Sequence, residues 1–332
     1  MTALRRQLGR FLLGAGLLLH LFTVFCFTVK PQHFAAYTVL PIWLWGGCGL
    51  LLCGGACFMM RGGWPWLMAA VWAITLLIGA DEARVLTHGG KSAPLPGPAA
   101  PHDGNPVVRV ITCNCALFVF GDPSRDLAAW QPDIVLLQDI YPHHVRLLAA
   151  ALFGERGDFR ARGSNGIITR WKIQREVPNT SNRDQQATIT LPDGSAVEVV
   201  NVHLTTAATD LRFWQRVTWR DHRINRARRL HELTLVQQAL AGSTDFPNTP
   251  VLFGGDFNAP ATDAVHQQLR RGLSDAFAAA GTGWGDTYHR RFPILRIDYL
   301  YASRHFLPVR CHTVTTRHSD HRMVVADFVM RK

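Results

Sequence analysis

Charged residues are scarce in this 332-residue sequence, and its first quarter has almost none. Only 18% of the residues are charged whereas 48% are hydrophobic, which is an apolar balance for a purely soluble protein. Three runs, residues 11–29, 40–60 and 64–80, contain no Asp, Glu, Lys or Arg. Buried helices of soluble domains seldom lack charge so completely, and each run approaches the roughly 20 helical residues that a bilayer core requires. The sequence therefore predicts a membrane anchor, residues 1–82, with three transmembrane helices.

A cleaved signal peptide is the alternative for the first run, because Arg5, Arg6 and Arg10 precede it. No clear small-residue cleavage site follows the run, and two further apolar runs do, so we favour an anchor that is retained.

The basic residues that flank the runs also predict an orientation. Arg5, Arg6, Arg10 and Arg61 fall on one side of a three-helix anchor, and basic flanks stay in the cytoplasm. Lys30 in the first outer loop opposes this assignment, as does a basic residue after the third run. We expect a multi-pass protein of the cytoplasmic (inner) membrane, with the lipid bilayer as a partner and the rest of the chain extracytoplasmic.

Cysteine is also too sparse to build a scaffold. Four of the seven cysteines lie in the apolar runs, which leaves Cys113, Cys115 and Cys311 in the rest of the chain. An odd count argues against a disulfide framework. Zinc can bind cysteine and histidine, and Cys113, Cys115, His318 and His321 are candidate ligands, but the absence of any CxxC pair argues against a structural zinc site. We expect Cys113 and Cys115 to pack as small apolar residues.

Residues 83–105 change character, because they interleave prolines with glycine and alanine (KSAPLPGPAAPHDGNP). Such a segment cannot form a core, so we predict a semi-extended linker. Residues 106–332 have the right length for one globular domain. The net charge of +11 is spread over both parts of the chain and is too small to indicate a nucleic-acid-binding protein by itself.

The stretch 251–260 (VLFGGDFNAP) reads as a buried strand that ends in polar residues. Gly254 and Gly255 permit a sharp turn, after which Asp256 and Asn258 point the same way from extended backbone. A carboxylate beside an amide can hold a water molecule and a phosphate oxygen. A polar turn that merely caps a core strand is the plain alternative, and partners elsewhere in the chain must decide between the two.

Short apolar runs bounded by turn residues predict further strands in this domain. They lie at 107–112, 134–138, 166–169, 187–191, 197–203, 251–254, 297–302 and 323–329, with helical patterns at 124–130, 142–153, 211–240 and 262–272. The mixture indicates an α/β arrangement of packed sheets flanked by helices. Most of these strands deliver a polar group at one end.

The ordered set NCALF, LLQD, NVHL, GGDFNAP, RIDYLY and SDHRMVV resembles the endonuclease/exonuclease/phosphatase superfamily, which is related to deoxyribonuclease I. The resemblance covers residues 106–332 and implies a four-layer αββα sandwich with the active site at one edge of its two sheets. The layout of three amino-terminal spans before such a domain also resembles membrane-anchored bacterial members, such as those linked to teicoplanin resistance.

The resemblance implies roles for particular residues. The metal ion would be held by Asn114, Asp139 and Asp320. The catalytic set would be His203, Asp256, Asn258, Asp298 and His321. Asp139 departs from the family pattern, which has glutamate after the glutamine, and the lost methylene can change the affinity for the ion. Oxygen ligands of this kind favour Mg²⁺ or Mn²⁺.

A cationic segment, LRFWQRVTWRDHRINRARRLHEL, begins at position 211. It is predicted to place Arg212, Arg216, Arg220 and Arg223 on one helical face, interleaved with aromatic residues. Such a face suits anionic lipid headgroups, or equally the phosphates and bases of a nucleic acid. A solvated face whose aromatic residues fill the core is the plain reading.

Three functions follow from these observations. An extracytoplasmic domain constantly meets lipid phosphates, so we favour a metal-dependent phosphoesterase of a lipid or lipid-linked phosphate. An extracytoplasmic nuclease acting on DNA or RNA is the second hypothesis. A catalytically inactive phosphate-binding module is the third, and the departure at Asp139 favours it. No protein partner can be inferred.

Overall fold

A computed structural model describes residues 3–85, 92–177, 181–206, 212–246 and 248–331. The chain divides into two compact units. The first comprises Met1–Thr87 and Asp210–Arg223, and the second comprises His88–Thr209 and Ile224–Lys332. The beginning of the predicted 211–240 helix and residues 86–91 of the predicted linker lie outside the described residues.

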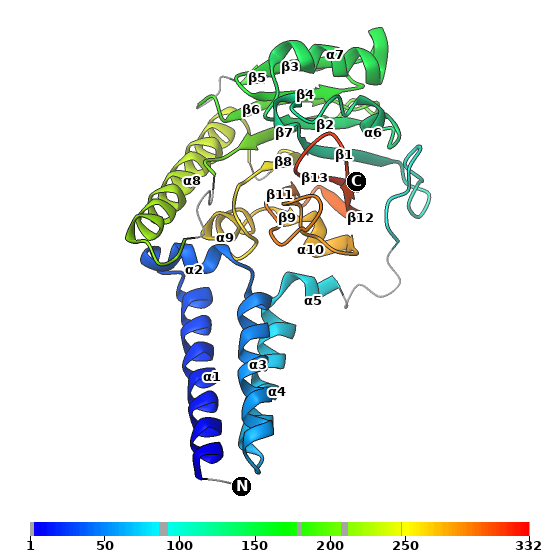
Figure 1. The fold of residues 1–332 in the computed structure, drawn as a ribbon. Helices are drawn as coiled ribbons and strands as arrows, with labels where there is room; N and C mark the ends of the chain where they lie inside the picture. The colour runs from blue at the N-terminus through cyan, green and yellow to red at the C-terminus, as the bar shows by residue number, and fades with distance from the viewer. Residues whose placement is uncertain (1–2, 86–91, 178–180, 207–211, 247, 332) are drawn as a thin grey trace. The chain divides into compact units, whose positions relative to one another are not determined.

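The first unit is helical (Figure 1). Its elements are α1 (Ala3–Val29), η1 (Gln32–Phe34), α2 (Ala35–Val39), α3 (Ile42–Met59), α4 (Trp64–Gly79) and α5 (Asp81–Val85). Helices α1 and α3 are long and apolar enough to cross a membrane, whereas α4 is apolar but shorter, with 16 residues. The helices thus match the positions of the predicted spans, and α4 as a third span stays a prediction.

Glycines let the helices α1, α3 and α4 approach one another closely. A Cβ atom at Gly49 of α3 would lie 2.1 Å from the ring of Trp72 on α4, so only glycine leaves room for this indole. Trp72 Nε1 donates to the carbonyl oxygen of Gly16 on α1 at 3.3 Å. The nitrogen Nε2 of His20 lies 2.8 Å from Thr75 Oγ1. These contacts hold the three helices together without any charged pair.

Helix α8 (Arg216–Ser243) begins in the first unit. Its Trp219 packs edge-on against Phe34, with ring centroids 6.2 Å apart, and donates from Nε1 to the carbonyl oxygen of Phe213 at 2.7 Å. The prediction that Arg212 lies on the cationic helical face is wrong, because α8 starts only at Arg216 and Arg212 precedes it in non-helical backbone.

The helical part of the predicted cationic face is thereby reduced. It consists of Arg216, Arg220 and Arg223, all exposed. Trp219 is partly buried in the aromatic cluster of the first unit rather than presented beside these arginines.

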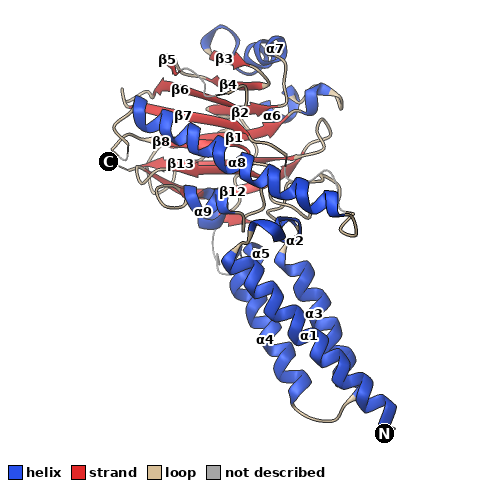
Figure 2. Ribbon diagram, turned by 90° about the vertical axis from the view of Figure 1, so that its left-hand side faces the viewer, coloured by secondary structure: helices blue, strands red, loops and turns tan. Residues whose placement is uncertain are grey.

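The second unit is built on two β-sheets (Figure 2). The seven-stranded sheet has the order β10-β12-β13-β1-β2-β4-β3, and the six-stranded sheet has the order β5-β6-β7-β8-β11-β9. The strands are β1 (Val107–Asn114), β2 (Ile134–Gln138), β3 (Asp158–Arg162), β4 (Asn165–Thr169), β5 (Ile173–Val177), β6 (Asp184–Thr190), β7 (Ala196–His203), β8 (Val251–Asp256), β9 (Ser274–Asp275), β10 (Gly281–Thr282), β11 (Asp298–Ala302), β12 (Phe306–Thr315) and β13 (Arg322–Met330).

Helices cover the outer face of each sheet. The short α6 (Ser124–Ala128) and α7 (Pro142–Phe153) pack against the seven-stranded sheet through one apolar core, which includes Leu127, Val145 and Leu148. The part of α8 that belongs to this unit and α9 (Ala264–Leu269) pack against the six-stranded sheet through a second core. A further short helix, α10 (Ala276–Ala280), lies beside β12. The predicted four-layer αββα sandwich is confirmed.

Polar side chains also join the two sheets in the middle of the sandwich. Gln138 at the end of β2 donates from Nε2 to Asn201 Oδ1 on β7 at 2.6 Å. Asn201 in turn donates from Nδ2 to the carbonyl oxygens of Leu137 and Gly166 at 2.8 and 3.0 Å. Because these buried groups satisfy one another, they fix how the two sheets face each other close to the ends of β2 and β7.

The second half of the predicted linker is attached to the domain. The guanidinium of the buried Arg109 donates to the carbonyl oxygens of Leu95 and Gly97 at 2.9 and 2.7 Å, and pairs with Asp327. The amide of Gly97 donates to the carbonyl oxygen of Ala129 at 2.7 Å. A semi-extended spacer was predicted, but this stretch is held against the surface by buried charge.

Candidate active site

Strand direction brings the predicted polar residues to one edge of the sandwich. Strands β1 and β2 are parallel, with Asn114 opposite Gln138 at their ends. Strands β7 and β8 are also parallel, with His203 opposite Asp256. Strand β11 runs the other way, so its first residue, Asp298, lies opposite Asp256.

The loop before β13 reaches the same edge. Strand β13 is antiparallel to β1 and begins directly after His321, so the start of β13 lies beside the end of β1. The amide of His321 donates to Ser319 Oγ at 3.0 Å, and this bond shapes the loop that presents the imidazole ring.

A hydrogen bond joins the two sheets within the site. Asn114 Nδ2 on β1 donates to Asp256 Oδ2 on β8 at 3.0 Å. The other oxygen of Asp256 accepts from the backbone amide of Asn258 at 2.8 Å, and the side-chain amide of Asn258 donates to the carbonyl oxygen of Leu204 at 3.0 Å. Asp256 is thus held in one orientation by Asn114 from the other sheet and by Asn258 two residues later.

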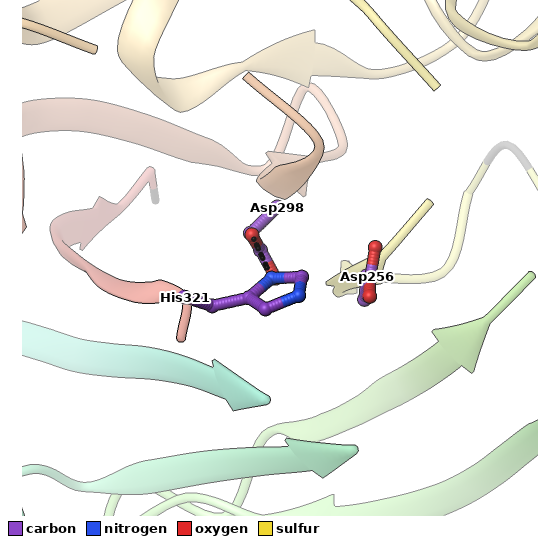
Figure 3. A group of neighbouring side chains, drawn as sticks. All are labelled: Asp256, Asp298 and His321. Carbon is purple, nitrogen blue, oxygen red and sulfur yellow. Dashed lines mark hydrogen bonds and ion pairs between the residues drawn. The ribbon is translucent and has the colours of Figure 1, made fainter. Parts of the chain in front are cut away.

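Asp298 and His321 form the second pair (Figure 3). His321 Nδ1 lies 2.9 Å from Asp298 Oδ2, and both side chains are buried. The backbone amide of Asp298 donates to Thr287 Oγ1 at 3.2 Å, which fixes the start of β11. The second carboxylate oxygen, Asp298 Oδ1, is buried and has no hydrogen-bond partner among the described residues.

This pairing keeps the imidazole charged. Burial alone would lower the pKa of His321, but the Asp298 carboxylate, together with Asp256 and Asp320, raises it to about 10. His321 is therefore protonated at neutral pH and donates its Nδ1–H to Asp298. Burial raises the pKa of Asp256, and the nearby Asp298 raises it further, while His321 and His203 act in the opposite direction.

His203 lies between two carboxylates. Its Nε2 is 3.7 Å from Asp256 Oδ2, and its Nδ1 is 3.7 Å from Asp139 Oδ1. Asp139 follows β2 with a left-handed backbone (φ 47°), and its carbonyl oxygen accepts from the amide of Leu117 at 2.7 Å. Asp320 is half-buried, and its charge contributes to the raised pKa values of both His321 and Tyr288.

Two different sets of side chains are possible metal ligands. In the part of the chain that the structure describes, Asp256, Asp298 and His321 form a group whose ligand atoms lie within 4.8 Å of one another. Because His321 Nδ1 is bonded to Asp298 in this group, we interpret it as a proton-holding cluster. Asn114, Asp139 and Asp320 are the set expected from the sequence.

The second set has suitable chemistry for a hard divalent ion. It offers amide and carboxylate oxygens, which Mg²⁺ and Mn²⁺ prefer. The side chain of Asp139 is 38% exposed, so an ion from solvent can reach it. The amide oxygen of Asn114 accepts one backbone hydrogen bond, from Ala116 at 2.9 Å, and this oxygen has a second lone pair.

Sequence reasoning missed the residues that support the site from the segment between β10 and β11. Thr287 holds the amide of Asp298, and the ring of Tyr288 packs at a tilt of 56° against that of His321, with centroids 5.0 Å apart. Arg290 donates to the carbonyl oxygens of Arg317 and Ser319 at 2.5 and 2.7 Å, which fixes the loop that carries His321. This segment has no strand or helix periodicity, so only its three-dimensional position reveals it.

The cationic residues predicted as a substrate or membrane contact do not belong to the second unit, which carries this cluster. Arg212, Arg216, Arg220 and Arg223 belong to the first unit, and none of the contacts described above involves them.

Comparison with known proteins agrees with the geometry. The profile of the "Endonuclease/Exonuclease/phosphatase family" matches residues 111–321, which include every residue of the cluster. A comparison with curated proteins finds no match.

Solved structures share the fold of the second unit. An endonuclease/exonuclease/phosphatase family protein from Bacteroides thetaiotaomicron is 16% identical, with a TM-score of 0.52 over 69% of this chain and 99% of that one. A mannosyl-6-phosphatase from the same organism is 17% identical, with a TM-score of 0.52 over 67% and 100%. Humanized Danio rerio TDP2 is 19% identical, with a TM-score of 0.50 over 67% and 98%.

At these identities the likeness shows the fold alone, whereas the family profile spans most of the chain and the site. The chain therefore belongs to the endonuclease/exonuclease/phosphatase family, whose members are metal-dependent phosphoester hydrolases.

Proposed function

We propose that this protein is a membrane-anchored phosphoesterase that hydrolyses a lipid or lipid-linked phosphate at the outer face of the cytoplasmic membrane. The proposal depends on one observation: the same chain contains membrane-length apolar helices and a cluster of polar residues suited to phosphoester hydrolysis. Helices α1 and α3 are long and apolar enough to span a membrane, and the second unit gathers Asp256, Asp298 and His321 at one edge of its sheets.

Some residues of the site would stabilise negative charge on the phosphate, and others would transfer protons. Asp298 holds the protonated His321, whose positive charge faces a phosphoryl oxygen of the substrate. This positive charge stabilises the negative charge on the phosphoryl group that is transferred. Asp256 is oriented by Asn114 and Asn258, and its raised pKa suits a group that orients the attacking water and draws its proton. We infer that His203, which lies between Asp139 and Asp256, protonates the leaving oxygen.

A divalent ion, Mg²⁺ or Mn²⁺, would be held by Asn114, Asp139 and Asp320. When bound, it supplies positive charge that neutralises the phosphate. The carboxyl group of Asp139 is one methylene shorter than the usual glutamate, so we expect weaker metal affinity than a glutamate would give. The family resemblance and the oxygen-rich ligand set support this assignment.

The extracytoplasmic placement rests on the basic flanks of the apolar runs, Arg5, Arg6, Arg10 and Arg61. A domain tethered there meets lipid phosphates continuously, whereas it meets nucleic acid only occasionally. The mannosyl-6-phosphatase among the similar structures is in keeping with a phosphatase, although it shares only the fold.

A nuclease acting outside the cytoplasm is the second candidate, and one surface observation favours it. Trp214 is 80% exposed and precedes the exposed Arg216 by two residues, so an indole and a guanidinium are available to a base and its phosphate. A catalytically inactive binding module is the third candidate, but the Asp298–His321 pair and Asp256 are all in place, so we do not favour it.

A substrate screen separates the candidates. Full-length protein in detergent would be supplied with Mg²⁺ or Mn²⁺ and offered lipid phosphates, lipid pyrophosphates and DNA side by side. We expect turnover of a lipid phosphate or pyrophosphate. Turnover of DNA alone would establish the nuclease, and no turnover of any of these or of a generic phosphodiester would establish the binding module.

The exposed arginines give a second comparison. Replacing Arg212, Arg216, Arg220 and Arg223 with Gln should lower turnover of lipid phosphate in anionic vesicles and leave hydrolysis of a short water-soluble phosphodiester nearly unchanged. Loss of DNA cleavage with a weaker dependence on salt would instead support the nuclease, because a polymer makes several phosphate contacts at once.

A further inference from the structure

An apolar loop lies at the surface beside the candidate active site. Residues 115–121 (CALFVFG) contain no charged side chain and no side-chain hydroxyl, amide or acid group. Surface loops are normally polar, yet here Leu117, Val119 and Phe120 are exposed, and Val119 is 76% exposed. Exposed apolar side chains gathered on one segment usually mark a surface that binds something apolar.

Hydrogen bonds hold the backbone of this loop in place. The amide of Cys115 donates to Gln138 O at 2.8 Å, and the amide of Val119 donates to Ala116 O at 2.9 Å. Three consecutive residues other than glycine, from Ala116 to Phe118, have positive φ angles of 44°, 51° and 63°. Such backbone is unfavourable and is typically retained where it serves a function.

A second loop, residues 288–292, contributes another exposed apolar side chain. Phe292 is 76% exposed and follows the exposed Arg291. Arg290 connects the two loops, because its guanidinium carbon lies 4.8 Å from the centre of the Phe120 ring. Arg290 therefore joins the 288–292 loop to the apolar loop.

Both loops flank the candidate active site. The amide of Leu117 donates to the carbonyl oxygen of Asp139 at 2.7 Å, and the ring of Tyr288 packs against that of His321. An object that rests on Val119 and Phe292 would thus be next to the residues proposed to handle the phosphate.

We propose that residues 115–121 and 288–292 form a docking surface for a lipid bilayer, with Val119 and Phe292 entering the boundary between headgroups and acyl chains. This inference rests on the proposed function and specifies how the site meets its substrate. Valine and leucine cannot stack on nucleic-acid bases as aromatic residues do, so the aliphatic part of the surface favours hydrocarbon.

The charges around the surface fit lipid headgroups. The loops that form and adjoin this surface carry three basic residues, Arg290, Arg291 and Arg317. They carry two acidic residues, Asp122 and Asp320. Asp320 belongs to the proposed metal set, so the rim outside the site is mainly basic, as anionic headgroups require. Two helices of the same chain are able to span a membrane, so a bilayer is within reach of the protein.

Photo-crosslinking tests the contact directly and does not depend on activity. A benzophenone amino acid would replace Phe292 in the full-length protein, reconstituted in vesicles of phosphatidylcholine and phosphatidylglycerol. The matched control is Leu307, an exposed residue near the start of β12, at the opposite end of that strand from the site. We expect lipid adducts at position 292 and few at 307. Equal labelling at both positions, no lipid adducts, or adducts to protein alone would overturn the proposal.

Kinetics give a second test. The combined change Val119→Gln and Phe292→Gln should raise the KM for phosphatidic acid in these vesicles by about tenfold or more, because two apolar contacts with the bilayer are lost. Turnover of soluble bis(p-nitrophenyl) phosphate should stay the same, as should both activities in a Leu147→Gln, Leu307→Gln control. An unchanged KM, or an equal loss on both substrates, would contradict the docking role.

The two tests also separate this inference from the proposed function. If the parent protein hydrolyses the soluble phosphodiester but no lipid phosphate, the proposed lipid substrate is wrong, and lipid adducts at position 292 still decide whether the surface docks. If the parent hydrolyses phosphatidic acid without adducts at position 292, the proposed function stands and the docking surface is wrong.

Discussion

Asn114 donates a hydrogen bond of 3.0 Å to Asp256, although the two residues belong to different sheets. This bond ties the end of β1 to the end of β8, and Asp256 is also within 3.7 Å of His203. The site is therefore made by the packing of the two sheets, and no single motif contains it.

The first prediction concerns this pair. Asp256→Ala should lower kcat by at least about two orders of magnitude, because it removes the group proposed to orient the attacking water, and Asn114→Ala by at least about tenfold, because Asn114 orients Asp256. The double variant should be little worse than Asp256→Ala, since residues that act as a unit are not additive. Steady-state kinetics of the three variants on a soluble phosphodiester measure this, with the exposed Asp245→Ala as a control. Strictly additive losses would mean that the bond does not matter for catalysis.

The second prediction concerns the residue that replaces the usual glutamate. Asp139→Ala should abolish activity with the fold intact, whereas Asp139→Glu should retain or raise it and lower the concentration of Mg²⁺ or Mn²⁺ needed for half-maximal rate. Metal titrations of activity compare the three proteins, and circular dichroism checks the fold. Full activity in Asp139→Ala would remove Asp139 from the metal site.

The third prediction concerns stability and pH. His266 is fully buried, with Nε2 2.9 Å from the carbonyl oxygen of Ala259 and Nδ1 2.8 Å from the hydroxyl of Tyr301. Burial lowers its pKa to about 3 from the ordinary 6.5. In the unfolded chain, His266 therefore binds a proton below about pH 6.5. In the folded chain, it does so only near pH 3. The neutral, buried His266 therefore contributes fully to the free energy of unfolding above pH 6.5. This contribution decreases as the pH falls towards 3, by up to about 1.4 kcal/mol per pH unit.

Thermal unfolding of the full-length protein in detergent at pH 7 and pH 5 measures this effect. His266→Gln should be less stable than the parent at pH 7, because a buried hydrogen-bonded ring is lost, but its stability should decline less between the two pH values. An equal decline in both proteins would show that His266 does not account for the acid sensitivity.

The fourth prediction concerns placement. A reporter fused after Lys332 in a bacterial host should give an extracytoplasmic signal, because the basic flanks keep the amino terminus inside. Protease added to intact spheroplasts should release the domain by cutting within residues 83–105, the stretch between the helices and the domain. A cytoplasmic reporter signal would overturn the orientation and make intracellular nucleotides candidate substrates.

Much of the fold could be predicted because its central strands are buried on both faces. Strands such as β2 and β8 read as continuous apolar runs, and polar residues stand where they end. Strands β3 and β5 were missed because they lie at sheet edges and have sequences rich in polar residues, DFRAR and IQREV. Strand β12 was missed although it has ten residues, because Pro308 and a register shift interrupt its pattern.

The site was less accessible to sequence reasoning because its contacts join distant segments. The motifs indicated His321, Asp298 and Asp256, but not the support from Thr287 and Arg290, which depends on how an irregular segment packs. The cationic helix shows the same limit.

Two arginines of that helix are buried, although a run of basic residues suggests a solvated face. Arg226 and Arg229 both pair with Asp263, at 3.1 and 3.4 Å. Sequence spacing indicates which residues share a helical face, but only a partner on another element shows which face turns inward.

This protein is a metal-dependent phosphoester hydrolase, and we propose that its active site is the Asp298–His321 pair together with Asp256. The most direct measurement is the turnover of bis(p-nitrophenyl) phosphate by the full-length protein with Mg²⁺ or Mn²⁺, by the same protein with excess EDTA, and by His321→Ala. We predict turnover in the first case, none with EDTA and recovery when the metal is restored, and a rate lower by at least about two orders of magnitude in His321→Ala. An undiminished rate in EDTA or in His321→Ala would contradict the account.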